Sequence, residues 1–173
     1  MKKFSFISVV AVAAVVFLGC KKNNGSYDIP PIDNETFRIN RCGQEVECNR
    51  NIDFGNNEYL TMSISPKAVP LADGKFTLTY NNQTSRDFVY GNPFMLYYFE
   101  NNKWNFVEFK ENIGFSLIGY VLKAFSEGNQ QGNVIWCFDN LKRGVYRYVT
   151  DISPSSFGGS EITYFLYDEF ILK

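Results

Sequence analysis

The segments Leu60-Thr61-Met62-Ser63-Ile64-Ser65 and Lys75-Phe76-Thr77-Leu78-Thr79-Tyr80 each alternate apolar and polar residues. A period of two is typical of a β-strand that buries one face and exposes the other. Turn-forming residues lie between the two segments, at Ser65-Pro66 and from Pro70 to Gly74. The sequence therefore predicts two strands joined by turns.

Outward from this pair, further segments are rich in the β-branched and aromatic residues that strands favour. Phe94–Phe99 and Trp104–Phe109 flank Glu100-Asn101-Asn102-Lys103, where asparagine tolerates the positive φ of a tight turn, so a β-hairpin is predicted. The segment Phe115–Phe125 is compatible with a buried strand or with a short helix. Three more strands are expected at Val134–Phe138, Val145–Thr150 and Ile162–Leu172, with turns near Gly132, Gly144 and Gly158-Gly159.

Short strands at nearly regular intervals, without a strong helix signature beyond the first 20 residues, indicate an antiparallel β-sandwich or a barrel. Aromatic residues make up 17% of the chain, which suits pleated sheets whose bulky side chains pack across strands. An all-β class is therefore expected, with a single domain over residues 58–173.

Several short segments of this region follow one another in an order and at a spacing that resemble a known domain family. They are Leu78-Thr79-Tyr80-Asn81-Asn82-Gln83, Tyr90-Gly91, Asn102-Lys103-Trp104, Gly119-Tyr120-Val121-Leu122 and Leu141-Lys142-Arg143-Gly144-Val145-Tyr146-Arg147. In order and spacing they resemble the bacterial immunoglobulin-like (Ig-like) domains attached to many cell-envelope lipoproteins. The resemblance implies an antiparallel β-sandwich of about seven strands outside the cytoplasm, and Tyr146 resembles the tyrosine corner of sandwich folds. It implies no catalytic or ligand residues, because sandwich domains host unrelated functions.

The first 20 residues have the pattern of an export signal. Met1-Lys2-Lys3 is followed by the apolar run Phe4–Leu18, which is shorter than the about 20 residues that a membrane-spanning helix needs. Phe17-Leu18-Gly19-Cys20 resembles the lipobox of bacterial lipoproteins, which implies that residues 1–19 are cleaved off and that Cys20 carries fatty acids. Two or three acyl chains hold a protein stably at a membrane. The alternatives are an uncleaved anchor or an ordinary secretory signal.

Residues 20–57 are expected to connect the lipid to the domain. Residues 21–34 are mostly polar and contain Pro30-Pro31, so they are predicted to form an extended tether. Residues 35–57 show little periodicity and are expected to be a loosely packed lead-in rather than a strand. Lys21-Lys22-Asn23-Asn24 is not the acidic run that marks transfer to the cell surface in some Gram-negative lineages, which favours the periplasmic face.

Three cysteines remain beside Cys20. Cys42 and Cys48 enclose a short loop, and outside the cytoplasm we expect them to form a disulfide worth about 2 kcal/mol, although spacing alone does not establish the pairing. Cys137 is expected to be a small buried residue. Because the sequence has no histidine and no C-x2-C pattern, we expect neither a metal site nor a cofactor.

The charge of the chain offers no surface for nucleic acid. Removal of residues 1–19 takes away two lysines and leaves a formal charge of −3. Basic residues gather near one glycine turn, at Lys142, Arg143 and Arg147. We expect them to form a solvated basic corner that would meet at most an anionic partner.

The residue types also limit catalysis. A chain without histidine cannot use Ser-His-Asp or Cys-His chemistry. Asp168 and Glu169 are neighbours on a predicted strand, so they would point to opposite faces instead of into one cleft. We expect them at a strand end or a bulge. An enzyme that uses carboxylates alone is a third hypothesis.

Recognition by a surface is the remaining class of function. Tyr97, Tyr98 and Trp104 lie on the predicted hairpin, where an exposed patch would stack on a sugar or anchor a protein, although packing in the core is the favoured interpretation. The sequence thus predicts a lipid-anchored, non-enzymatic binding or scaffolding module of the cell envelope, whose partner is an envelope protein or a glycan. The alternative is an eight-stranded barrel that carries small apolar molecules in a cavity lined by Phe and Tyr.

Overall fold

The computed structural model describes residues 37–155 and 162–173, and all regular structure in them is β-strand, which confirms the predicted all-β class. The signal peptide, Cys20, the tether and the predicted turn at Gly158-Gly159 lie outside the described residues. No helix in the described ranges is long and apolar enough to cross a membrane. The strands are β1 (Phe37–Arg41), β2 (Gln44–Asn49), β3 (Asn51–Gly55), β4 (Glu58–Ser65), β5 (Ala68–Val69), β6 (Lys75–Asn82), β7 (Phe88–Glu100), β8 (Lys103–Phe106), β9 (Tyr120–Leu122), β10 (Ser126–Asn133), β11 (Gly144–Pro154) and β12 (Tyr164–Leu172).

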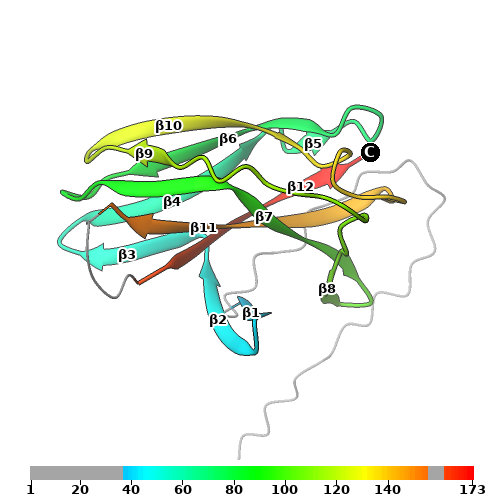
Figure 1. The fold of residues 1–173 in the computed structure, drawn as a ribbon, viewed down its shortest axis with the longest axis horizontal. Helices are drawn as coiled ribbons and strands as arrows, with labels where there is room; N and C mark the ends of the chain where they lie inside the picture. Colours follow the sequence, from blue (N-terminus) through cyan, green and yellow to red (C-terminus); the bar gives the residue numbers. More distant parts are fainter. Residues whose placement is uncertain (1–36, 156–161) are drawn as a thin grey trace, which may run out of the picture.

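The strands form two sheets that pack face to face (Figure 1). The larger sheet has the order β1-β2-β12-β11-β7-β8, with β5 paired to β12 and β9 paired to β7. The smaller sheet has the order β10-β6-β4-β3. Neighbouring strands are antiparallel, except where β12 pairs with β2 and with β5. The predicted antiparallel Ig-like sandwich is confirmed, with more short strands than the about seven that the resemblance implied.

The main core lies between the two sheets and contains the alternating residues of β4 and β6. Each of these side chains is at most 4% exposed: Leu60, Met62, Ile64, Phe76, Leu78 and Tyr80. Aromatic and aliphatic side chains of β7, β11 and β12 fill the space opposite them. In the described part of the chain the two sheets stay separate and do not close into a barrel, so the alternative of an eight-stranded carrier barrel has no support.

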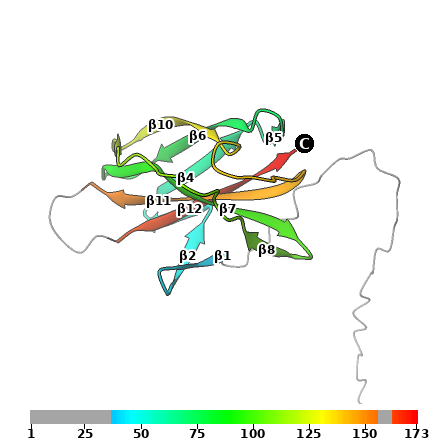
Figure 2. The same cartoon turned by 45° about the vertical axis from the view of Figure 1, so that its right-hand side comes forward.

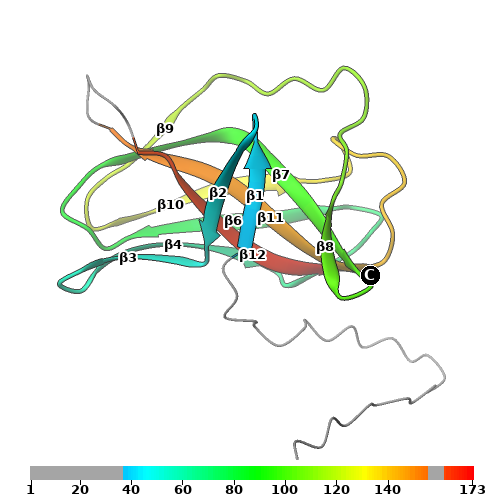
Figure 3. The same cartoon turned by 90° about the horizontal axis from the view of Figure 1, so that it is seen from below.

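A second, smaller core covers the outer face of the larger sheet. Its fully buried members are Ile39, Cys48, Tyr97, Val149, Phe165 and Tyr167. The β1–β2 hairpin lies across β11 and β12 on this side, near β8, as Figure 2 and Figure 3 show. Strands β11 and β12 are therefore covered on both faces, and most residues of both strands are buried.

The prediction of a loose lead-in at residues 35–57 is wrong, because β1, β2 and β3 form there. Strand β2 pairs with β12 in the larger sheet, and β3 pairs with β4 in the smaller one. Each of the three strands has a single fully buried residue: Ile39, Cys48 and Ile52. One buried position per strand is too few to produce a period of two in the sequence.

The prediction of a strand at Val134–Phe138 is also wrong, because this segment forms a turn. The strand that precedes it, β10, was not predicted, since two of its inward positions are Gly128 and Gly132. A Cβ on Gly128 would lie 2.8 Å from Tyr90 Oη, and a Cβ on Gly132 would lie 2.3 Å from Phe76 Cε2. Rings from other strands fill the space that apolar side chains of β10 would otherwise occupy.

The predicted hairpin is confirmed as β7 and β8, although β8 ends at Phe106. Asn101 and Asn102 have φ values of 54° and 59°, as the turn required. The strands expected at Val145–Thr150 and Ile162–Leu172 are confirmed as β11 and β12. Within Phe115–Phe125 only the short strand β9 is regular, and no helix forms.

The predicted disulfide between Cys42 and Cys48 is absent, and both thiols are free. Cys42 lies exposed in the β1–β2 turn, whereas Cys48 is buried at the far end of the hairpin, opposite Phe37. Cys48 lies four residues along β2 from Gln44, which is beside the turn, and each residue advances the strand by roughly 3.4 Å. The two cysteines are therefore too far apart for a disulfide, which needs Cα atoms within about 7 Å. The third thiol, Cys137, is half-buried against the main core.

Candidate binding groove

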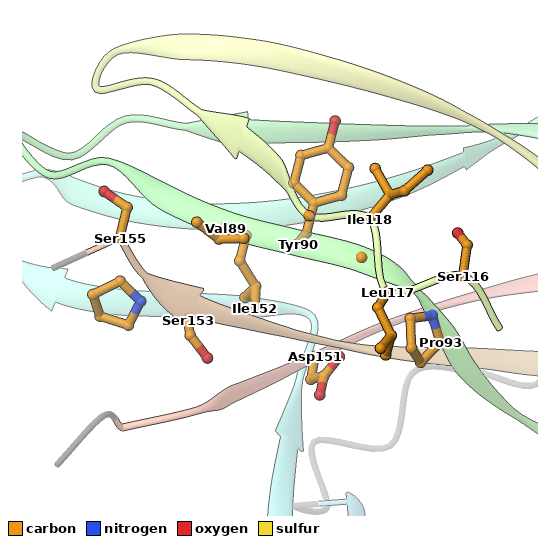
Figure 4. Close-up of a pocket in the computed structure, with 13 residues that line it drawn as sticks. Val89, Tyr90, Pro93, Ser116, Leu117, Ile118, Asp151, Ile152, Ser153 and Ser155 are labelled. Carbon is orange, nitrogen blue, oxygen red and sulfur yellow. The ribbon is translucent and has the colours of Figure 1, made fainter. Parts of the chain in front are cut away.

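A groove of 510 Å³ lies on the larger sheet, away from the aromatic residues that the sequence singled out. Its walls come from β7, from β11 and from residues 116–119, which pass over these strands (Figure 4). The lining is mixed: apolar groups make up slightly more than half of its surface, and polar side chains come from all three walls. The apolar side chains are Val89, Pro93, Leu117, Ile118, Ile152 and Pro154.

The floor of the groove is an irregularity in the pairing of β7 and β11. Thr150 pairs with Phe94 and Ile152 pairs with Tyr90, so three residues of β7 lie opposite the single residue Asp151. Those three residues are Gly91-Asn92-Pro93, and proline has no N–H for a ladder hydrogen bond. Bulges of this kind bend a strand and are frequent beside binding sites.

The segment 116–119 approaches β7 closely at one point. Gly119 allows this approach, because a Cβ there would lie 2.9 Å from Val89 Cγ1. Asn92 holds the other end of the segment, since its Nδ2 donates to Ser116 Oγ. The two contacts place the chain over the groove without adding it to the sheet.

The side chains between these two contacts are open to solvent. Leu117 is 101% exposed and Ile118 is 57% exposed. Farther along, Val121 and Phe125 are 55% and 65% exposed. Leu117 and Ile118 line the groove, and exposed apolar surface beside a groove is typical of an interaction site. The dense apolar residues of Phe115–Phe125 were visible in the sequence, but without a helix or strand period they did not indicate a surface.

The groove carries little free charge. Asp151 accepts a hydrogen bond at 3.0 Å from Arg41 Nη1 of β1, so its carboxylate is already paired. Burial, and to a smaller extent the neighbouring Tyr120, raise the pKa of the Tyr90 phenol, which therefore stays neutral. Tyr90 stacks on Tyr80 with ring centroids 4.1 Å apart. These groups suit an uncharged ligand that has both apolar and hydrogen-bonding groups.

The aromatic residues predicted as a possible binding surface are packed instead. Tyr97 is 8% exposed and belongs to the second core, and Tyr98 packs on Tyr146 with ring centroids 5.0 Å apart. Trp104 is half-buried and covers the Arg147 guanidinium, whose Cζ lies 4.1 Å from the centre of its rings. The structure thus favours packing over an exposed binding patch, as the sequence did.

The prediction of a solvated basic corner is wrong for Arg147, because its side chain is buried and only 7% exposed. Its Cζ lies 4.3 Å from the Phe37 ring and 4.2 Å from the Tyr167 ring, in addition to Trp104. A guanidinium between aromatic rings is stabilised by cation–π attraction. Arg147 Nε also donates to Glu169 Oε1 at 3.0 Å. Arg147 is therefore part of the second core and not a docking group.

Asp168 and Glu169 do not lie at a strand end or a bulge, which corrects the prediction. Both are buried within β12, opposite Tyr148 and Arg147 of β11. Glu169 accepts hydrogen bonds from Arg147 and Arg50. Both carboxylates are engaged by cations, so neither is available for acid–base catalysis in a cleft.

Asp168 connects the two sheets from the other face of β12. Its Oδ2 accepts hydrogen bonds from Lys67 Nζ and, at 2.7 Å, from the backbone N–H of Ile64 in β4. The alternation of side chains along β12 thus sends Asp168 to the main core and Glu169 to the second core. Within the described ranges, no three side chains of the Cys, Asp and Glu types are grouped to hold a metal ion.

A family model described as "Bacterial Ig-like domain" matches residues 56–170. The chain belongs to the bacterial Ig-like domain family. No protein with a curated description matches it.

Two solved structures resemble part of this Ig-like domain. One is the CsuC–CsuE chaperone–tip adhesion subunit pre-assembly complex from archaic chaperone-usher Csu pili of Acinetobacter baumannii, at 17% identity, with a TM-score of 0.35 over 62% of this chain and 55% of that one. The other is the ASH/PapD-like domain 7 of human CEP192, at 14% identity, with a TM-score of 0.30 over 65% of this chain and 86% of that one. Similarities this low carry no information about function.

The Ig-like domain also has the tyrosine corner that the resemblance implied. Tyr146 Oη donates to the backbone oxygen of Lys142 at 2.9 Å and accepts from the backbone N–H of Lys142 at 3.0 Å. Gly144, with φ of 152°, lies so close to Tyr98 that a Cβ would be 2.5 Å from its Cε2. The corner is structural, because both of its hydrogen bonds remain within the turn before β11.

Proposed function

We propose that this protein is a non-enzymatic recognition module of the cell envelope, held by fatty acids on Cys20 and facing the periplasm. Its groove takes an extended, uncharged segment of an envelope protein. The observation that carries the proposal is the groove between β7, β11 and residues 116–119, beside which the Leu117 side chain is wholly exposed.

The chemistry of the groove supports this class of partner. Its walls combine apolar side chains with neutral hydroxyl groups, and its one carboxylate, Asp151, is already paired with Arg41. An uncharged segment would therefore bury its side chains against Pro93 and Leu117 without leaving an unpaired charge. The buried Asp168 and Glu169 support the non-enzymatic part, because both carboxylates are used to hold the fold together.

The groove is tested by site-specific photo-crosslinking of the full chain in cells. A photoreactive residue at position 117 should give one discrete protein adduct, and the same residue at position 103, which is exposed at the start of β8, should not. Leu117→Asp should reduce binding of the captured protein at least 10-fold. Equal labelling from both positions, or no adduct from position 117, would contradict the proposed site.

The anchor is tested separately. Cys20→Ala should abolish fatty-acid labelling and release the protein from membranes, while Cys137→Ala should leave both unchanged. If Cys20→Ala kept the fatty-acid label and stayed at the membrane, lipid anchoring at Cys20 would be refuted. That result would not affect the proposed groove.

A further inference from the structure

The outer face of the smaller sheet carries rows of neutral hydrogen-bonding side chains. Cross-strand register places Gln131 beside Thr77 and Thr77 beside Ser65. The next row consists of Asn129, Thr79 and Ser63. We call these two rows the amide–hydroxyl face. At about 4.8 Å between strands, each row extends roughly 10 Å across the sheet.

The side chains of the amide–hydroxyl face are open to solvent and ordered by one another. Asn129, Gln131, Ser63 and Ser65 are exposed. Thr79 Oγ1 donates to Asn129 Oδ1 at 2.8 Å, and Gln131 Nε2 donates to Thr77 Oγ1 at 3.1 Å. These bonds hold the amides in place and leave their remaining donors and acceptors free for a ligand, since an amide and a hydroxyl can each do both.

Aromatic side chains lie at both ends of this face. Trp136 is 74% exposed and lines a 460 Å³ depression together with Gln131 and Lys75. Tyr59, which is 36% exposed, lies at the opposite end of β4. Lys75 forms an ion pair with Asp73 at 2.9 Å, so the charge beside Trp136 is compensated.

We propose that the amide–hydroxyl face and Trp136 bind an uncharged polysaccharide. Sugar hydroxyls both donate and accept hydrogen bonds, as the side chains of both rows do. The negative face of an indole ring attracts the C–H groups on the apolar side of a pyranose, and an exposed tryptophan is available for this stacking. The binding chemistry is that of neutral, polyhydroxylated chains, whether from the cell wall or from outside the cell.

A protein partner fits this face less well. Protein interfaces are enriched in aromatic residues, methionine and arginine at a desolvated centre, with serine depleted. The centre of the amide–hydroxyl face has Thr77, Thr79, Ser63 and Ser65 and no apolar side chain between them. Its burial by a protein would desolvate many polar groups without an apolar contact in return.

Affinity electrophoresis of the full chain tests the proposal, in a non-ionic detergent without a sugar headgroup. The gels contain hydroxyethyl cellulose, xyloglucan, glycogen or mannan, and a parallel arm measures co-sedimentation with purified cell-wall sacculi. We expect retardation or sedimentation by at least one of these glycans. Retardation by a soluble chain would indicate an external polysaccharide, and sedimentation with sacculi would indicate the glycan strands of the wall.

Variants then assign the binding to this face. Trp136→Ala and the double variant Asn129→Ala/Gln131→Ala should each weaken binding at least 10-fold, whereas Phe106→Ala, an exposed aromatic residue on the other sheet, should bind as the parent does. Circular dichroism checks that each variant is folded. The proposal is overturned if no glycan in either arm binds, or if folded Trp136→Ala and the double variant bind with unchanged affinity.

Discussion

Arg147 on β11 donates from Nε to Oε1 of Glu169 on β12 at 3.0 Å, and both side chains are buried. The two residues are direct partners in the register of the sheet. Three aromatic rings surround the guanidinium, and Arg50 adds a second cation to the carboxylate. A buried ion pair contributes little net stability relative to apolar residues in its place. Removal of one partner is strongly destabilising, because the other charge then stays buried without a counterion.

Glu169→Gln should lower the free energy of unfolding by about 3–5 kcal/mol, because the neutral amide leaves Arg147 and Arg50 without their shared counterion. Urea denaturation of the full chain in detergent measures this change. The matched control is Arg41→Ala, which removes the exposed pair with Asp151 and should cost less than about 1 kcal/mol. Similar costs for the two variants would show that burial does not amplify the Arg147–Glu169 interaction.

The two tryptophans should differ sharply when each is replaced by alanine. Trp104→Ala removes a ring that covers Arg147 and packs against Phe37, so we expect a loss of about 2–4 kcal/mol. Trp136→Ala removes a side chain that is 74% exposed and should change stability by less than about 0.5 kcal/mol. Thermal and urea unfolding give both values, and a larger loss for Trp136→Ala would contradict the assignment of Trp104 to the second core.

The thiols should react according to their burial. Burial raises the pKa of Cys48 to about 12, so its reactive thiolate is scarce at neutral pH. Cys42 is exposed in the β1–β2 turn. A maleimide at pH 7 should therefore label Cys42 rapidly in the folded protein and label Cys48 only after unfolding, as measured by peptide mass spectrometry. Recovery of a peptide in which Cys42 and Cys48 are joined would reinstate the disulfide.

Stability should fall in alkaline solution. Burial raises the pKa of Tyr97 and of Tyr146 from 10 to about 12, and that of Cys48 from 9 to about 12. The folded state thus holds these protons more tightly than the unfolded chain, and the stabilisation is complete below about pH 9 and lost as pH rises towards 12. Each group contributes a slope of at most about 1.4 kcal/mol per pH unit.

Urea midpoints from pH 7 to pH 11 follow this loss. Tyr97→Phe keeps the ring in the second core and removes the ionisable hydroxyl, so its decline above pH 10 should be shallower than that of the parent. A flat profile up to pH 11 in the parent would show that these groups ionise without unfolding the domain.

Local patterns predicted much of the fold because they depend on neighbours in the chain. The alternation at Leu60–Ile64 and Phe76–Tyr80 identified β4 and β6, and the asparagine pair between β7 and β8 identified their hairpin. The same reasoning failed for β10, where glycines face rings from other strands, and for β1 to β3, which bury one residue each. In these strands, side chains from strands distant in the sequence supply most of the apolar packing. The sequence of the strand itself therefore shows no period of two.

The sites depended still more on tertiary structure. The sequence by itself determined an all-β chain, a resemblance to Ig-like domains, and an absence of histidine that excludes common catalytic sets. Only the tertiary structure decided that Arg147 lies in an aromatic box, that Glu169 meets Arg50 from 119 residues away, and that Trp136 lies beside rows of amides and hydroxyls. The physical reason is that a period of two assigns a side chain to a face of its strand, whereas strand register and sheet packing decide which other side chains share that face.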